Sequence, residues 1–214
     1  MSRLLLVCAV VAAGTAPAVA ATLRDARLTV VFAPGGCDVT SRFVVDTASP
    51  ALVEHRLMVS NGAVPDFVVI GGIAGRADVI ARSARLPVSL TGSGRNEYSI
   101  RYHVSLDVVA DGRCPLLVPH VPTDGVTRSV LITADVPDDA AVLPGGFPAF
   151  AWRDRRGTVT ISHIPSFVRV RYAPRDAPIA WRDKLDPARV VDVLAVCTIG
   201  ISTLGWVVLR RRRT

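Results

Sequence analysis

A long apolar stretch near the C-terminal end constrains the fold of this 214-residue chain more than any other feature. Val190 to Leu209 contain one charged side chain, Asp192. A helix of this length spans about 30 Å, the thickness of the hydrocarbon core of a bilayer. A buried C-terminal helix is the alternative, but core helices are rarely apolar on every face. The sequence therefore predicts a single transmembrane helix over residues 187–209.

Basic and aromatic residues at the ends of this stretch predict its orientation. A run of four arginines follows it directly: Arg210, Arg211, Arg212 and Arg213. Because basic residues beside a transmembrane helix stay in the cytoplasm, we expect residues 210–214 to form a cytoplasmic tail. Trp181 and Trp206 stand where indole rings anchor a helix to the two membrane interfaces. A proline-containing linker, residues 174–186, connects the helix to the preceding domain.

The N-terminal residues predict export. Met1 to Arg3 provide a short positive segment, and Leu4 to Ala13 provide an apolar segment. Ala18-Val19-Ala20 then supplies the small residues that a signal peptidase requires. We therefore expect residues 1–20 to be a signal peptide that is removed after Ala20 or one residue later. The mature chain is then a single-pass protein of the cell membrane, with its N-terminal domain outside and its tail in the cytoplasm.

The formal net charge of +7 carries little information about partners. Arg3 and the tail arginines supply most of it, so the exported domain keeps a small basic excess and no nucleic-acid partner is predicted. Lys184 is the only lysine and glutamine is absent, a bias typical of a GC-rich bacterial genome. We expect the partners to be the membrane and another envelope or membrane protein, and the sequence does not indicate an oligomeric state.

The four cysteines are divided by predicted compartment. Cys8 lies in the signal peptide and Cys197 in the membrane helix, whereas Cys37 and Cys114 share the oxidising exterior. We therefore predict a disulfide between Cys37 and Cys114, which stabilises the fold by about 4 kcal/mol because it restricts the unfolded chain. Two cysteines without suitably spaced histidines do not predict a metal site.

Residues 21–173 are predicted to form one domain built from strands. In the clearest strand, Glu97 to Val109, apolar residues such as Tyr98 and Ile100 alternate with polar ones. The other predicted strands are Leu28–Phe32, Val39–Val45, Val53–Val59, Asp66–Ile70, Leu86–Leu90, Leu116–Val121, Arg128–Ala134, Ala149–Trp152, Thr158–His163 and Phe167–Tyr172. Ala77 to Arg85 fits either a strand or one or two turns of helix.

Turn residues separate these strands at short intervals. The predicted turns lie at residues 34–36, 111–112, 122–125, 137–139, 144–146 and 155–157. Many short strands punctuated in this way are typical of an immunoglobulin-like β-sandwich, and an open barrel is the alternative. The predicted fold class is therefore mainly β, an exported sandwich followed by one transmembrane helix.

Residues that could carry chemistry are scattered along the sequence. The four histidines have no metal-binding or catalytic spacing: His55, His103, His120 and His163. Arg101, His103 and Asp107 share one face of the long predicted strand and form a weak polar cluster, which an ordinary solvated strand face explains. Asp138 and Asp139 are adjacent in a turn, so their carboxylates diverge. No catalytic, cofactor-binding or metal-binding residue is predicted, and no cofactor is expected.

The sequence favours a non-enzymatic role for the exported domain. A tail of five residues is too short for a cytoplasmic effector, and no catalytic motif is present. We therefore expect a membrane-anchored interaction or accessory module of a bacterial cell envelope. The alternatives are a cell-envelope hydrolase that works through His103, Asp107 or His163, and a subunit of a surface assembly that donates or accepts a strand.

Overall fold

The computed structural model describes residues 21–59, 64–105, 111–123 and 129–176, together with Pro178 and Thr198. These ranges fold into strands that form three sheets, so the predicted mainly β class is confirmed. The largest sheet has seven strands in the order β13 (Ala151–Arg153), β14 (Arg156–Ile161), β11 (Val130–Asp135), β1 (Ala21–Ala33), β2 (Gly36–Thr47), β8 (Gly94–Ser105) and β4 (Val68–Ile70). Within it β1 and β11 are parallel, whereas the other neighbours are antiparallel.

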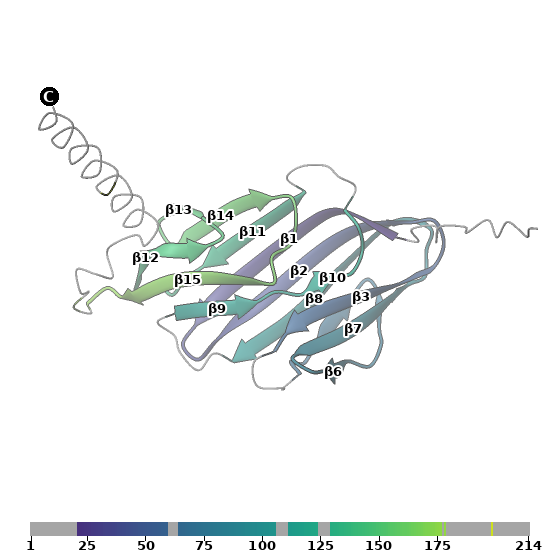
Figure 1. Ribbon diagram of the computed structural model, residues 1–214, viewed down its shortest axis with the longest axis horizontal. Coiled ribbons are helices and arrows are strands. Elements are labelled where there is room, and N and C mark those ends of the chain that lie inside the picture. Colours follow the sequence, from purple (N-terminus) through teal and green to yellow (C-terminus); the bar gives the residue numbers. More distant parts are fainter. Residues whose placement is uncertain are drawn as a thin grey trace, which may run out of the picture.

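Two smaller sheets lie side by side over one face of the seven-stranded sheet, so the architecture is consistent with a β-sandwich (Figure 1). The five-stranded sheet contains β10 (Val118–Pro119), β3 (Ala51–Met58), β7 (Ser83–Leu90) and β5 (Ile73–Ala74), with β6 (Asp78–Ile80) also paired to β7. The three-stranded sheet contains β12 (Ala140–Phe147), β15 (Phe167–Pro174) and β9 (Asp111–Pro115). Leu116 and Leu117 join β9 to β10, so one stretch of chain links the two smaller sheets.

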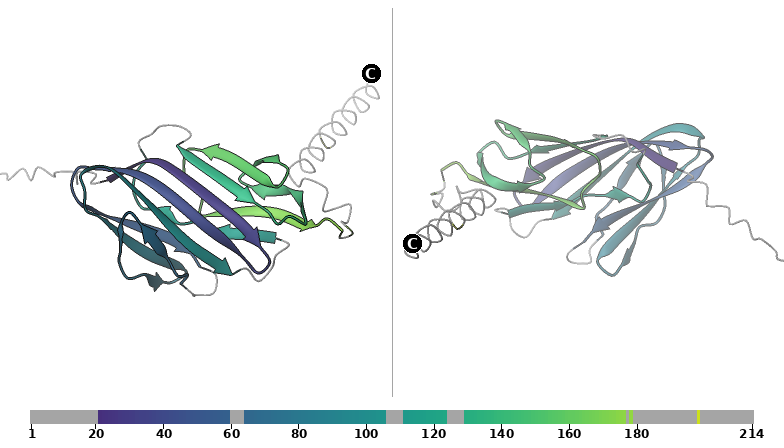
Figure 2. Two further views of the ribbon diagram at one scale, coloured as in Figure 1. Left: turned by 180° about the vertical axis from the view of Figure 1, so that it is seen from behind. Right: turned by 45° about the horizontal axis from the view of Figure 1, so that its top comes forward.

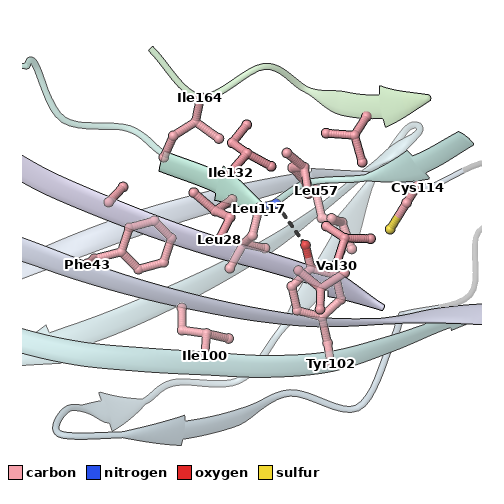
Figure 3. Packing of buried hydrophobic residues seen from close by; sticks show 14 of the residues in the cluster. Leu28, Val30, Phe43, Leu57, Ile100, Tyr102, Cys114, Leu117, Ile132 and Ile164 are labelled. Atoms are coloured by element: carbon pink, nitrogen blue, oxygen red, sulfur yellow. Dashed lines mark hydrogen bonds between the residues drawn. The ribbon is translucent and has the colours of Figure 1, made fainter. Parts of the chain in front are cut away.

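Side chains from both layers fill the core between the sheets (Figure 3). Tyr98, Ile100 and Tyr102 of β8 are buried, as the alternation in the sequence predicts. The backbone N–H of Leu117 donates to the Tyr102 hydroxyl over 3.0 Å, and that hydroxyl donates to the Pro115 carbonyl over 3.2 Å. The Tyr102 hydroxyl therefore provides a hydrogen-bond partner for two backbone groups at the irregular link between β9 and β10.

The predicted disulfide between Cys37 and Cys114 is present. Cys37 lies near the start of β2 and Cys114 near the end of β9, and both side chains are fully buried. The bond therefore joins the seven-stranded sheet to the three-stranded sheet, across residues that are far apart in the sequence.

The region between Phe67 and Leu90, which fits more than one secondary structure in the sequence, contains strands and turns. Ala77 to Arg85 is a hairpin and not a helix: β6 is followed by a turn in which Ala81 has φ of 57°, and then by β7. Gly71 and Gly72 carry the chain from β4, in the large sheet, to β5, in the five-stranded sheet. Gly71 has φ of +84°, and a Cβ there would lie 2.7 Å from the carbonyl oxygen of Glu97.

Three other sequence predictions need correction. Residues 111–112 are not a turn, because they pair with Val170 and Arg171 as part of β9. Residues 144–146 are not a turn either: they belong to β12, whose register with β15 shifts between Leu143 and Phe147 and so absorbs the proline and two glycines. The predicted strand over residues 116–121 is shorter, since only Val118 and Pro119 pair with β3.

Several predicted features lie outside the described residues. They are the signal peptide at 1–20, the transmembrane helix at 187–209 apart from Thr198, the tail at 210–214, and Trp181, Trp206 and the four tail arginines. The part of the chain that the structure describes contains no helix long and apolar enough to cross a membrane.

Candidate functional site

The predicted polar cluster of Arg101, His103 and Asp107 is described in part, and His103 has a carboxylate partner on the neighbouring strand. Arg101 and His103 are exposed on the outer face of the seven-stranded sheet, whereas Asp107 lies outside the described residues. His103 Nδ1 lies 2.8 Å from Asp38 Oδ1, because Asp38 of β2 stands directly opposite His103 in the strand register. Both side chains are more than half exposed. The outer sheet face therefore holds a solvent-exposed histidine-carboxylate pair.

The remaining histidines lie apart from this pair. His120 uses its backbone N–H to bond the carbonyl of Glu54 over 2.7 Å. His163 Nδ1 lies 3.3 Å from the hydroxyl of Ser162, its neighbour in sequence. Within the described ranges, no three His, Cys, Asp or Glu side chains are grouped closely enough to hold a metal ion. The structure therefore does not bring the candidate histidines of the sequence together.

His55 is fully buried between the sheets and is bonded through both ring nitrogens. Its Nδ1 lies 3.3 Å from the Leu86 carbonyl, and its Nε2 lies 2.9 Å from the Tyr98 hydroxyl. A carbonyl can only accept, so Nδ1 carries the proton and Nε2 accepts from Tyr98. Phe43 packs on both rings, with centroid distances of 5.2 Å to His55 and 5.4 Å to Tyr98.

Burial shifts the pKa of both members of this pair toward the uncharged form. It lowers the pKa of His55 from 6.5 to about 4, partly offset by hydrogen bonds with backbone groups of Leu86 and Val53. It also raises the pKa of the Tyr98 phenol. Neither group faces solvent, so we assign the pair to the core. The sequence carried a signal for this, because His55 occupies the inward position between Val53 and Leu57 in a period-two pattern.

An open groove of about 670 Å³ lies where the turn between β13 and β14 faces the ends of β1 and β11. Asp135 accepts two hydrogen bonds from Arg156, at 2.8 and 3.0 Å, and Asp138 forms an ion pair with Arg155. Of the two adjacent aspartates in the predicted turn, Asp138 is thus the one that pairs with Arg155 in this groove. Its charged side chains largely neutralise one another, and a nucleophile with a neighbouring base is not among its lining residues.

The outer face of the large sheet carries a row of threonines. Thr158, Thr133, Thr29 and Thr40 stand opposite one another in neighbouring strands β14, β11, β1 and β2. This face is seen uncovered in the view from behind (Figure 2). Threonine pairs across strands stabilise a solvated sheet, so this row has a structural explanation.

Large apolar side chains are exposed on neighbouring strands of the two layers, and we call this set of side chains the apolar rim. It consists of Val68 and Ile70 of β4, Ile73 of β5, Val79 and Ile80 of β6, and Leu52 of β3. Leu52 and Ile73 are 66% and 61% exposed, and both pair with Ser89, one on each side of β7. The pattern of apolar and polar residues predicted strands in this region, but it did not indicate that these apolar side chains are exposed. Six of the eleven exposed large apolar side chains of the described ranges belong to the rim.

The rim lies far from the point where the described chain ends. β15 runs to Pro174 at one end of the sandwich, whereas β3, β6 and β7 lie at the other end (Figure 1). The two views in Figure 2 show the same separation. Whatever follows residue 176 is therefore attached at the end of the domain opposite the rim.

Comparison with protein-family models and with curated proteins gives no match. Among solved structures, the chain is similar to an M1 zinc metallopeptidase from Deinococcus radiodurans, with 12% identity and a TM-score of 0.36 over 71% of this chain and 42% of that chain. It is also similar to leukotriene A4 hydrolase from Saccharomyces cerevisiae, with 10% identity and a TM-score of 0.40 over 76% of this chain and 30% of that chain. This chain therefore spans less than half the length of either protein.

Proposed function

We propose that this chain is a non-enzymatic interaction or accessory module of a bacterial cell envelope, tethered to the membrane by its C-terminal segment. The observation that carries the proposal is the apolar rim at the end of the domain remote from Pro174. A soluble domain gains nothing from exposing valine and isoleucine in one place unless another molecule covers them. A tether at the opposite end presents this surface away from the bilayer, toward a protein and not toward lipid.

The dispersal of chemically reactive side chains supports the same proposal. His103 pairs with Asp38 on an exposed sheet face, and His163 lies beside the hydroxyl of Ser162. His55 is fully buried in the core. A hydrolase needs a base, a nucleophile and an oxyanion-stabilising group within reach of one substrate atom. The groove beside Asp135 and Arg156 has no histidine, serine or cysteine among its lining residues, and the open pocket of about 300 Å³ that includes His120, Ser83 and Ser166 has no carboxylate among its own.

The tether and the localisation rest on the sequence. Val190 to Leu209 match a bilayer in length, and four arginines follow. We also keep the immunoglobulin-like class as a proposal. The two-layer arrangement supports it, whereas the seven-stranded sheet with its parallel β1–β11 pair differs from the antiparallel three- and four-stranded sheets of that fold.

Photo-cross-linking in intact cells tests the interaction role. A photoreactive amino acid replaces Ile73 on the rim or, as a matched control, Leu131, which is an exposed apolar residue of β11 on the outer face of the large sheet. We expect one discrete cross-linked product from position 73 and none from position 131. Equal cross-linking from both positions, or from neither, would contradict a binding role for the rim.

The hydrolase alternative has its own test. His103→Ala and His163→Ala remove the two histidines that the hydrolase alternative names, and both side chains are exposed. We expect both variants to support growth and envelope integrity like the wild type, because exposed substitutions usually change stability by about 0.5 kcal/mol or less. Loss of function in a folded variant would favour the hydrolase.

A further inference from the structure

An open groove of about 480 Å³ lies between β12, an edge of the three-stranded sheet, and β13, an edge of the seven-stranded sheet. Residues 142–146 of β12 form one wall, and Ala149, Phe150 and Trp152 form the other. The ring centroids of Phe150 and Trp152 are 5.6 Å apart. The lining of this groove contains no charged side chain, whereas three arginines and three aspartates line the groove beside Asp135.

The β12 wall of the groove is an irregular strand. Its register with β15 shifts between Leu143 and Phe147, so residues 144–146 form a bulge. Arg171 Nη1 donates to the Pro144 carbonyl over 2.9 Å and so ties the bulge to β15. Gly145, within the bulge, has φ of 94°, a conformation that favours glycine. The sequence therefore specifies the bulge, and the groove is part of the fold.

The lining suits a hydrocarbon chain better than a polypeptide. Its side chains supply one polar group, the indole N–H of Trp152. Pro144 has no N–H, and its carbonyl already accepts from Arg171. A peptide in the groove brings backbone N–H and C=O groups that need partners, whereas an acyl chain has no such groups to satisfy.

The described chain leaves the domain beside this groove (Figure 1). Pro174, the last residue of β15, pairs with Ala140, and Val142 of the lining follows two residues farther along β12. Twelve residues, 175–186, connect Pro174 to the predicted membrane helix and span at most about 40 Å when extended. The groove therefore lies within reach of the bilayer that this helix is predicted to cross.

Resting on the membrane tether proposed above, we propose that the groove binds an acyl chain of a phospholipid from the bilayer that anchors the protein. Phe150 and Trp152 pack on the hydrocarbon, and Phe147, which is 49% exposed, extends the apolar surface beside them. Arg171 supplies a positive charge at Pro144 for the lipid phosphate. β13 and β4 are opposite edges of the seven-stranded sheet, so this orientation turns the apolar rim away from the bilayer.

Quenching of tryptophan fluorescence by brominated lipid tests the proposal. The full chain with Trp181→Phe and Trp206→Phe keeps Trp152 as its single tryptophan, and it is reconstituted into phosphatidylcholine vesicles with plain or dibrominated acyl chains. Bromine quenches an indole only at short range, so we expect Trp152 to lose most of its fluorescence in the brominated vesicles. In a control chain, Trp152→Phe and Val68→Trp move the single tryptophan to exposed β4, where we expect no quenching.

A matched pair of substitutions makes the test specific to the groove. Ala149→Glu places a carboxylate in the lining, whereas Ala151→Glu places one at an exposed position of β13 that is not part of the lining. In the chain with Trp152 alone, Ala149→Glu should remove most of the quenching, because a charge in the groove excludes hydrocarbon. Ala151→Glu should leave the quenching unchanged. Circular dichroism of each variant confirms its fold.

Each other result overturns the proposal. Absence of quenching at Trp152, equal quenching at position 68, or equal effects of the two glutamate substitutions rules out an acyl chain in the groove. If Trp152 is unquenched by lipid but shielded from aqueous iodide, protein covers the groove. Shielding that persists in nanodiscs with a single chain assigns the cover to residues 177–186, and shielding that disappears assigns it to a second copy.

Flotation of the same samples separates this proposal from the tether on which it rests. A chain that floats with the vesicles while Trp152 is not quenched leaves the tether in place, and only the assignment of the groove is wrong. A chain that does not float with the vesicles contradicts the tether itself.

Discussion

Removing the buried pair His55 and Tyr98 should remove a defined part of the pH dependence of folding. The pKa of His55 is about 4 in the folded protein and 6.5 as the ordinary value, so the unfolded chain binds a proton more readily. The neutral His55 ring contributes its full share of the unfolding free energy above about pH 6.5, and this contribution is lost as the pH falls toward 4. A difference of this size corresponds to about 3 kcal/mol of unfolding free energy.

The assay is urea unfolding of the purified chain, followed by circular dichroism at several pH values from 7 to 4. The variant combines His55→Leu with Tyr98→Phe, because removing both partners leaves neither of them as an unpaired polar group in the core. Hydrogen bonds with Arg56 and Arg42 lower the pKa of Glu54 and Glu97, and that stability is lost as the pH falls further. These exposed carboxylates act equally in both proteins, so the difference between the two curves isolates His55.

We expect the wild type to lose about 3 kcal/mol more than the double variant between pH 7 and pH 4. Tyr98→Phe alone should cost about 1–2 kcal/mol at pH 7, since the His55 Nε2 then lacks its donor. Parallel curves for the wild type and the double variant would refute the assignment of His55 as a neutral core residue.

Further predictions concern other parts of the fold. Cys37 and Cys114 should resist alkylation until a reductant is added, and Cys37→Ala should lower the unfolding free energy by about 4 kcal/mol, measured with urea. Free thiols in protein extracted with the alkylating agent present would exclude the disulfide. Gly71→Ala should destabilise by about 1–3 kcal/mol, because it combines a positive φ with a close backbone oxygen, and a calorimetric Tm equal to the wild type would contradict this. His103→Ala should leave the Tm within about 2 °C, since the Asp38 pair is exposed.

Local patterns predicted much of the β structure because they depend on neighbouring residues. Alternation placed Tyr98, Ile100 and Tyr102 in the core, and compartment alone paired Cys37 with Cys114. β12 was missed because a proline and two glycines at residues 144–146 favour a turn, and only pairing with β15 holds them in a strand. The conformational preferences of neighbouring residues cannot reveal a partner strand that lies more than twenty residues away in the sequence.

Long-range arrangement limits what the sequence can show about sites. The parallel pairing of residues 26–31 with 130–135 follows from the whole topology and not from either segment. The contact between His103 and Asp38 could not be predicted from the sequence, because it depends on the register between β2 and β8. The apolar rim also depends on the topology, because β4, β5 and β6, which carry most of its side chains, are short strands of two different sheets.

Membrane topology is the most direct test of an exported domain tethered at its C-terminal end. One fusion places a reporter that is active only outside the cytoplasm after Ala177, and a second places a reporter that is active only in the cytoplasm after Thr214. The account predicts activity from both fusions, and loss of the second when Val190 to Leu209 is deleted. A cytoplasmic reporter that is active after Ala177, or an external reporter that is active after Thr214, would contradict it.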